Sequence, residues 1–451
     1  MNQDKTFLGT EPIGKLLRQL AVPTVIAQLV NMLYNIVDRI YIGHIPGNGD
    51  LALTGVGVCL PLILIVSAFA ALVASGGAPR ASIYMGKQDH ATAEKILGGC
   101  FALQLIVSAV LTAVLLLWNR PLLLTFGASG NTIDYAAAYM SVYAIGTVFV
   151  QLTLGMNAFI TAQGFAQIGM RTVLIGAVAN IVLDPLFIFA LNMGVRGAAL
   201  ATIISQCLSC VWVLRFLTGK NTVLRLRRST LRIDTKLLLP AVSLGASPFV
   251  MQSTESLLTV AFNVSLQKYG GDLAVGAMTI LTSVAQMIQL PLTGLAQGAQ
   301  PILSYNFGAH RPDRMKQVVR YNILIAVLFA VSIWGVVQLA PHAVVHLFTS
   351  DEQLTEITVW ALRIYMALGF TNAFQTGFQQ SFVALGEAKI SLFLALERKI
   401  FLLIPLIFIL PHFFADKLFA VFLAEPVADV LAAATTTVLF LIRFRKITNE
   451  M

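Results

Sequence analysis

An amide, a carboxyl group and a proline interrupt the otherwise apolar residues 176–189. Asn180 and Asp184 are four residues apart, so on a helix their side chains would share one face. Pro185 has no backbone N–H, and the carbonyl group of Ile181 therefore loses its helical partner. A carboxyl group within such a run is costly in lipid and usually faces a cavity or an ion path. The pattern predicts a binding site for a proton or a small hard cation. An Asp that only joins helices by hydrogen bonds is the alternative.

The composition is that of a membrane protein. Of the 451 residues, 57% are hydrophobic and 11% are charged, whereas soluble proteins carry about 25% charged residues. A net charge of +9 could indicate a nucleic-acid partner. The basic residues gather in alternate loops, however, as the positive-inside rule predicts. We therefore expect no nucleic-acid partner, and a multi-pass protein of the cell (plasma) membrane with both termini in the cytoplasm.

Twelve apolar segments are long enough to cross a bilayer, which takes about 20 residues. They cover residues 16–42, 51–79, 96–118, 133–160, 170–191, 194–217, 238–267, 275–304, 318–340, 355–383, 391–414 and 417–442. A basic stretch, residues 218–236, separates the first six from the last six. We expect an all-α integral membrane fold with an N-lobe over residues 1–217, a basic cytoplasmic linker over 218–236 and a C-lobe over 237–451.

The two halves of the chain resemble each other. Asp38 follows Pro23 by fifteen residues, and Glu255 follows Pro240 by the same distance. Three pairs of glycines also match at one offset of 222 residues: Gly86 and Gly308, Gly155 and Gly377, and Gly164 and Gly386. Six spans per half give both halves the same orientation, which implies a pseudo-two-fold axis along the membrane normal. Repeat-built transporters commonly place their site at the interface between the repeats.

Three motifs carry a resemblance to a known family. They are Asn35-Ile-Val-Asp-Arg-Ile-Tyr-Ile-Gly, Asn180-Ile-Val-Leu-Asp-Pro and Gly294-Leu-Ala-Gln-Gly-Ala-Gln-Pro-Ile-Leu-Ser-Tyr-Asn-Phe-Gly-Ala. Together they resemble the multidrug and toxic compound extrusion (MATE) family, in its MepA-like branch, and the resemblance covers essentially the whole chain. It implies two pseudo-symmetric six-helix lobes in a V around a central cavity. It also implies export of organic cations and drugs, driven by H⁺ or Na⁺ moving inward.

The resemblance also implies site residues. The family's cation site lies on spans 1, 5 and 6 of the N-lobe, and four positions match it here: Asp38, Asn180, Asp184 and Thr202. If the coupling ion is Na⁺, the same four residues would be its ligands. Some members place a second site in the C-lobe, with a Glu in span 7 that Glu255 matches and an Asp in span 10. Span 10 has no acid here, which favours coupling in the N-lobe.

Glu255 is a candidate for the substrate cavity or for a second acidic site. Other polar and methionine side chains of spans 1, 7 and 8 are candidates for the cavity: Asn31, Met32, Tyr34, Asn35, Met251, Gln252 and Met287. Methionine adapts to ligands of different shapes, although ordinary packing explains any one of these residues equally well. Pro185 is a candidate hinge, because proline weakens a helix.

These residues suggest an ion-coupled mechanism. Two carboxyl groups in one desolvated pocket cannot both ionise at low cost, so uptake of H⁺ or Na⁺ would neutralise them and repack spans 1 and 5. A lipid-linked precursor flippase of the wider MOP superfamily is the alternative. It would need several basic residues in the cavity, and the spans hold few. We expect no enzymatic activity, no cofactor, a monomer, and membrane lipids and small lipophilic or cationic drugs as partners.

Overall fold

The computed structural model describes residues 6–47 and 49–451. Within these ranges the ordered elements are helices, and no β-strand occurs. The first half contains α1 (Phe7–Thr10), α2 (Ile13–Gly43), α3 (Gly49–Gly86), α4 (His90–Leu117), α5 (Asn119–Thr125), α6 (Ile133–Ile145), α7 (Thr147–Ala162), α8 (Ala166–Pro185), the π-helix η1 (Leu186–Ala190) and α9 (Gly194–Thr218).

The second half begins with a 3₁₀ turn and a long bent helix. It contains η2 (Arg228–Thr230), α10 (Thr235–Gly308), α11 (Pro312–Leu339), α12 (Pro341–Val345), α13 (Glu352–Tyr365), η3 (Gly369–Thr371), α14 (Asn372–Ala384), α15 (Ala388–Leu396), the π-helix η4 (Glu397–Leu403), α16 (Ile404–Ile409), η5 (Leu410–His412) and α17 (Lys417–Asn449). The predicted all-α class is therefore confirmed.

Several of the predicted spans are broken or joined in the structure. Eight helices of the described chain are long and apolar enough to cross a membrane, and two further spans are helix pairs bent by 57° (α6 and α7) and 48° (α13 and α14). The seventh and eighth segments that we expected are two helices, which meet at a sharp reversal at Gly271, and the label α10 covers both. Gly271 has φ +63°, a conformation that glycine adopts at low cost. The eleventh segment is divided among α15, η4 and α16.

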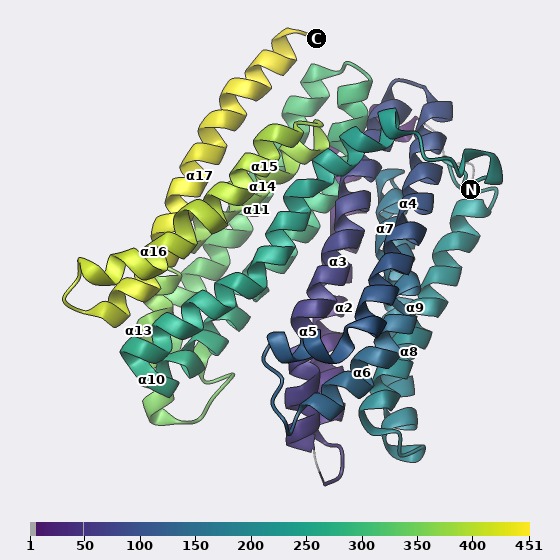
Figure 1. Ribbon diagram of the computed structural model, residues 1–451. Helices are drawn as coiled ribbons and strands as arrows, with labels where there is room; N and C mark the ends of the chain where they lie inside the picture. The colour runs from purple at the N-terminus through teal and green to yellow at the C-terminus, as the bar shows by residue number, and fades with distance from the viewer. Residues whose placement is uncertain (1–5, 48) are drawn as a thin grey trace.

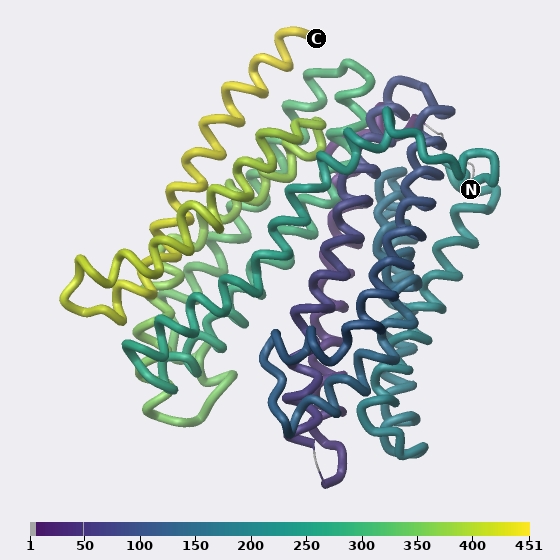
Figure 2. The backbone as a smooth tube through the Cα atoms, in the orientation of Figure 1, coloured from purple at the N-terminus to yellow at the C-terminus, as the bar shows by residue number. Residues whose placement is uncertain are grey.

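The helices form two lobes that meet at one end only. Figures 1 and 2 show α2–α9 on one side and α10–α17 on the other, close together at the end that holds both termini and apart at the opposite end. We call these the terminus end and the far end. The hydrophobic core agrees: one buried cluster contains residues of both lobes, including Leu17 and Ile302. Two other clusters, around Phe262 and around Tyr143, each lie essentially within one lobe.

Close backbone contacts join the lobes at the terminus end. A Cβ added to Gly86 on α3 would lie 2.0 Å from the carbonyl oxygen of Tyr305 on α10. A Cβ added to Gly308, the residue 222 positions later, would lie 1.9 Å from the carbonyl oxygen of Ile83. Only glycine permits this approach, because any side chain would push the helices apart. One of the three glycine pairs noticed in the sequence, Gly86 and Gly308, therefore lies at a pseudo-symmetric contact between the lobes.

The basic stretch between the lobes packs against the N-lobe. The side-chain oxygen of Gln163 accepts hydrogen bonds from the backbone N–H groups of Val223 (2.9 Å) and Leu224 (2.7 Å). Arg227 forms a long ion pair with Glu94 of α4 (3.6 Å). The linker is thus held in place by polar contacts, while its predicted bounds of 218–236 stay a prediction.

Candidate functional site

Two acids and an amide of the N-lobe meet between α2 and α8. The carboxyl groups of Asp38 on α2 and Asp184 on α8 interact directly. Asn180, one turn before Asp184, donates a hydrogen bond from Nδ2 to Asp184 Oδ1 at 3.1 Å. Asp184 and Asn180 are buried. The structure therefore brings together three of the four predicted cation-coupling residues.

Several oxygen atoms of this group have no protein donor. Asp38 Oδ1, Asp184 Oδ2 and Asn180 Oδ1 are buried, and no described residue donates a hydrogen bond to them. Leaving buried carboxylate oxygens unpaired is costly, as is placing two negative charges side by side. A shared proton or a hard cation removes both costs, because carboxylate and amide oxygens are suitable ligands for such ions. The donor set fits the H⁺ or Na⁺ site that the sequence predicts.

Thr202 lies at the edge of this group. It is on α9, and its hydroxyl group interacts with that of Tyr139 on α6. Tyr139 is buried, and it lies close enough to Asp38 for an electrostatic interaction between the two side chains. Tyr139 thus connects the fourth predicted residue to the acidic pair, and our sequence reasoning missed it. Its signal is the repetition of tyrosines at positions 135, 139 and 143, which places a polar stripe along one helix face.

The backbone changes its helical form next to Asp184. Pro185 is the last residue of α8, and the π-helix η1 follows it directly. Short π-helical segments often occur at functional sites, and proline is a common cause of helix irregularity. Phe189 of η1 packs edge-on against Tyr41 of α2, with ring centroids 6.3 Å apart. A movement at Pro185 would therefore displace a side chain that packs against α2. The hinge role of Pro185 stays a prediction.

The predicted cavity residues divide into two groups. Asn31, Met32, Tyr34 and Asn35 lie on α2 beside Asp38, and Asn35 donates to the carbonyl oxygen of Asn31 at 2.7 Å. Met251, Gln252, Glu255 and Met287 lie on α10 in the other lobe. The two groups therefore belong to opposite sides of the V, and the structure places Met287 and the Glu255 side chain among exposed residues.

A second cluster of charges lies inside the C-lobe. Arg398 of η4 binds Asp429 of α17 through two nitrogens, at 3.0 and 2.6 Å, and Glu425 at 3.1 Å. Asn372 of α14 donates to Asp429 at 2.9 Å. Lys399, the next residue along η4, forms an ion pair with Glu255.

Our sequence reasoning missed the acids of this cluster. Glu425 and Asp429 are four residues apart in an apolar helix, the same spacing that identified Asn180 and Asp184. Arg398 forms salt bridges with both of these acids inside the lobe.

Replacing Arg398 by Met is expected to destabilise the protein strongly. Glu425 and Asp429 would then be buried without their cation, which typically costs about 3–5 kcal/mol. Thermal unfolding in detergent should show a clearly lower midpoint. Arg120→Met is the matched control, because Arg120 pairs with Asp134 at the surface, where such a pair contributes about 1 kcal/mol or less. Equal midpoints for the two variants would show that the buried cluster adds no stability.

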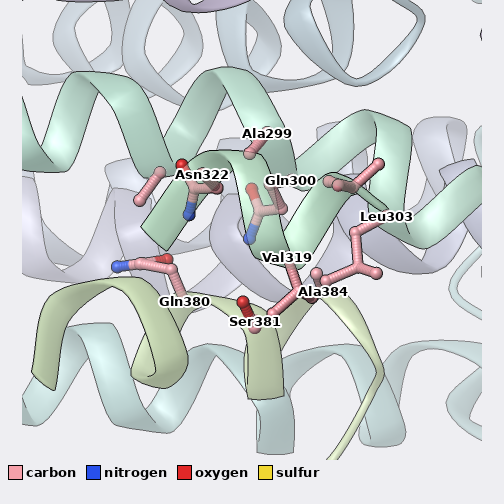
Figure 3. A pocket seen from close by; sticks show the side chains of 10 residues that line it. Ala299, Gln300, Leu303, Val319, Asn322, Gln380, Ser381 and Ala384 are labelled. Carbon is pink, nitrogen blue, oxygen red and sulfur yellow. The ribbon is translucent and has the colours of Figure 1, made fainter. Parts of the chain in front are cut away.

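A small pocket lies elsewhere in the C-lobe. Figure 3 shows Gln300 of α10, Asn322 of α11, and Gln380 and Ser381 of α14 around it. Its lining residues include no acid or base. It therefore offers no counter-charge for a cation, in contrast to the Asp38–Asp184 pair.

Two repeated six-helix lobes with buried charges in their spans define a multi-pass membrane transporter. Comparison with known proteins identifies the family. The family model described as MatE matches residues 23–186 and 248–409, one copy in each lobe. The chain therefore belongs to the MatE family, as its motifs suggested.

Individual relatives agree with this assignment. The chain is 26% identical to the multidrug export protein MepA of Staphylococcus haemolyticus over 436 residues, which is 96% of this chain and 95% of that protein. It is also 26% identical to MepA of Staphylococcus aureus (strain N315) over 447 residues, 97% of this chain and 96% of that protein. A multidrug resistance MATE transporter of the MOP superfamily, solved in an outward-facing conformation, matches 99% of both chains with a TM-score of 0.92 and 22% identity. This structural likeness confirms the two-lobe fold.

Proposed function

We propose that the protein is an antiporter that exports organic cations and drugs in exchange for H⁺ or Na⁺. The observation that carries this proposal is that Asp38 meets the buried Asp184 and that each carboxyl group has a buried oxygen without a donor among the described residues. The names of the MepA relatives, which are multidrug export proteins, support the substrate class. Acidic side chains on both lobes favour positively charged substrates over anions.

Ion binding and conformation are coupled because one conformation favours the charged state of Asp38 and Asp184, and the other favours their neutralised state. When Asp38 and Asp184 are both charged, repulsion between them favours an arrangement in which α2 and η1 separate or admit water. When H⁺ or Na⁺ neutralises the pair, close packing of α2 against α8 and η1 becomes favourable. An ion that binds one conformation better shifts the population toward it. One charge moving down 100 mV supplies about 2.3 kcal/mol, enough to drive such a shift.

The proposed orientation places the terminus end in the cytoplasm of the cell membrane. Basic residues lie at that end: Arg311 and Arg314 donate to backbone carbonyl oxygens of the N-terminal residues Gly9 and Leu8, and Arg443 lies near the C-terminal end of α17. The positive-inside rule assigns such an end to the cytoplasm. The lobes then diverge toward the outside. One chain supplies both lobes and hence the whole interface between them, so we propose that a monomer carries out transport.

Imposing one gradient at a time tests the proposal. The protein is reconstituted in liposomes loaded with a fluorescent lipophilic cation, and efflux is followed under a Na⁺ gradient alone and under a pH gradient alone. We expect one of the two gradients to drive efflux. A response to pH alone makes the acidic pair a proton site, whereas a response to Na⁺ alone makes Asp38, Asn180, Asp184 and Thr202 its ligands. No response to either would contradict the antiporter and favour the lipid-linked precursor flippase, for which lipid-linked substrates are then assayed.

A further inference from the structure

Asp38 and Glu255 occupy corresponding places in the two lobes. Asp38 lies fourteen residues after Thr24, which donates to the carbonyl oxygen of Gly294 in the other lobe at 2.6 Å. Glu255 lies fourteen residues after Ala241, whose carbonyl oxygen packs against Gly76 in the other lobe. Four turns of helix take about 14.4 residues. Both acids therefore continue the helix face that meets the opposite lobe, nearer the far end.

Asp38 and Glu255 differ in the charge of the residue that each contacts. Asp38 meets a second carboxyl group, that of Asp184. Glu255 meets the ammonium group of Lys399. Lys399 and Asp184 lie in corresponding spans, which follow the matched glycines Gly164 and Gly386, but they do not occupy matching positions within these spans. The C-lobe thus contains a fixed cation in the span where the N-lobe has an acid that needs a cation.

The side chain of Lys399 is buried inside the C-lobe, whereas the side chain of Glu255 is exposed. The Lys399 side chain is 4% exposed, and the Glu255 side chain is 56% exposed. Lys399 Nζ also donates to the backbone carbonyl oxygen of Met251 at 2.6 Å. If another cation binds Glu255, Lys399 can still donate to the carbonyl oxygen of Met251. The ammonium group therefore need not leave its place when the ion pair is broken.

Two neighbouring cations of the π-helix η4 contact different helices. Arg398 and Lys399 are neighbours in sequence, yet Arg398 binds the acids of α17 and Lys399 binds α10. The side chains of Glu255, Glu425 and Asp429 carry three formal negative charges against the two positive charges of Arg398 and Lys399. One further positive charge would balance the cluster, and Glu255 is its most exposed acid.

We propose that Lys399 is a built-in competitor that sets the affinity of Glu255 for organic ammonium ions. A lipophilic amine or quaternary ammonium compound would bind Glu255 from the space between the lobes and displace the Lys399 contact. Lys399 is thus a specificity-determining residue rather than a purely structural one. This proposal rests on the substrate class proposed above, but it is independent of which ion the N-lobe couples to, because it concerns binding without any gradient.

Equilibrium binding of rhodamine 6G, a lipophilic organic cation, to the protein in nanodiscs tests the proposal. We compare Lys399→Gln, Glu255→Gln and the double variant by fluorescence polarisation. Gln at position 399 loses the charge but keeps a donor for the Met251 carbonyl oxygen. Lys417→Gln is the matched control, since Lys417 is a C-lobe cation that lies over the Tyr269 ring and not at Glu255. Unfolding midpoints confirm that each variant is folded.

We expect Lys399→Gln to tighten binding by about threefold to tenfold, because the internal competitor is gone. Glu255→Gln should weaken binding by a similar factor, and in the Glu255→Gln background Lys399→Gln should give no gain. Lys417→Gln should leave the affinity unchanged. Folded Lys399→Gln protein that binds the cation no better than the wild type would overturn the proposal, as would an equal gain in the Glu255→Gln background. Neither result would bear on gradient-driven efflux, which tests the antiporter separately.

Discussion

Asp184→Asn is expected to reduce gradient-driven efflux to the level of empty liposomes. Asn has nearly the shape of Asp but can neither take up a proton nor neutralise Na⁺. The amide group of the new Asn can donate a hydrogen bond to the carboxylate of Asp38, which would then have a permanent partner without any ion. The acidic pair would thus be fixed in a state that resembles the ion-bound one. Efflux of a fluorescent organic cation from proteoliposomes, under the gradient that drives the wild type, measures the loss.

Asp134→Asn is the control for this variant. Asp134 belongs to the same lobe but forms a surface ion pair with Arg120, so its loss should leave the efflux rate essentially unchanged. The unfolding midpoint of Asp184→Asn should match or exceed that of the wild type, because a buried charge has been removed. Wild-type efflux by folded Asp184→Asn protein would remove Asp184 from the coupling mechanism.

Gly86→Ala is expected to lower the efflux rate by more than tenfold and to shift the lobes away from the described arrangement. The added methyl group would lie 2.0 Å from the carbonyl oxygen of Tyr305, a distance at which the helices must move apart. This contact belongs to the terminus end, so the conformation in which that end is closed becomes costly. The conformation that is closed at the far end gains population in return.

Spin labels at Asn131 and Glu352, one on each lobe at the far end, report the shift. Both residues are exposed, and their separation should become shorter in Gly86→Ala than in the wild type. Gly57→Ala is the control, because a Cβ at Gly57, on the same helix α3, meets no atom within 4 Å. An unchanged label separation in Gly86→Ala, with normal efflux, would show that the glycine contact does not govern the closure of the terminus end.

The sequence was informative about the fold because membrane spans are strongly constrained. Backbone groups in lipid must be satisfied by helices, so long apolar runs predicted helical spans reliably, and matched glycines such as Gly86 and Gly308 predicted the repeat. The breaks were not predictable. The bend between α6 and α7 and the π-helical segment η4 in the eleventh span depend on packing between helices, which periodicity along one segment does not describe.

The two lobes differed in how much of their sites the sequence predicted. Asp184 stood out because Asn180 and Pro185 surround it, and a family motif covers all three. Glu425 and Asp429 had the same spacing, but their meaning depends on Arg398, which reaches them only through the fold. Likewise, Lys399 and Glu255 are 144 residues apart. Partners so distant in sequence leave no local pattern, so only the structure could reveal them.

The ion movement that accompanies export tests the central claim most directly. Proteoliposomes are loaded with a lipophilic cation, and H⁺ or Na⁺ uptake is recorded while the cation leaves, for the wild type, Asp184→Asn and Asp134→Asn. We predict ion uptake in proportion to cation efflux in the wild type and in Asp134→Asn, and none in Asp184→Asn. Cation efflux by the wild type without uptake of either ion would contradict the assignment of Asp38 and Asp184 as the coupling site.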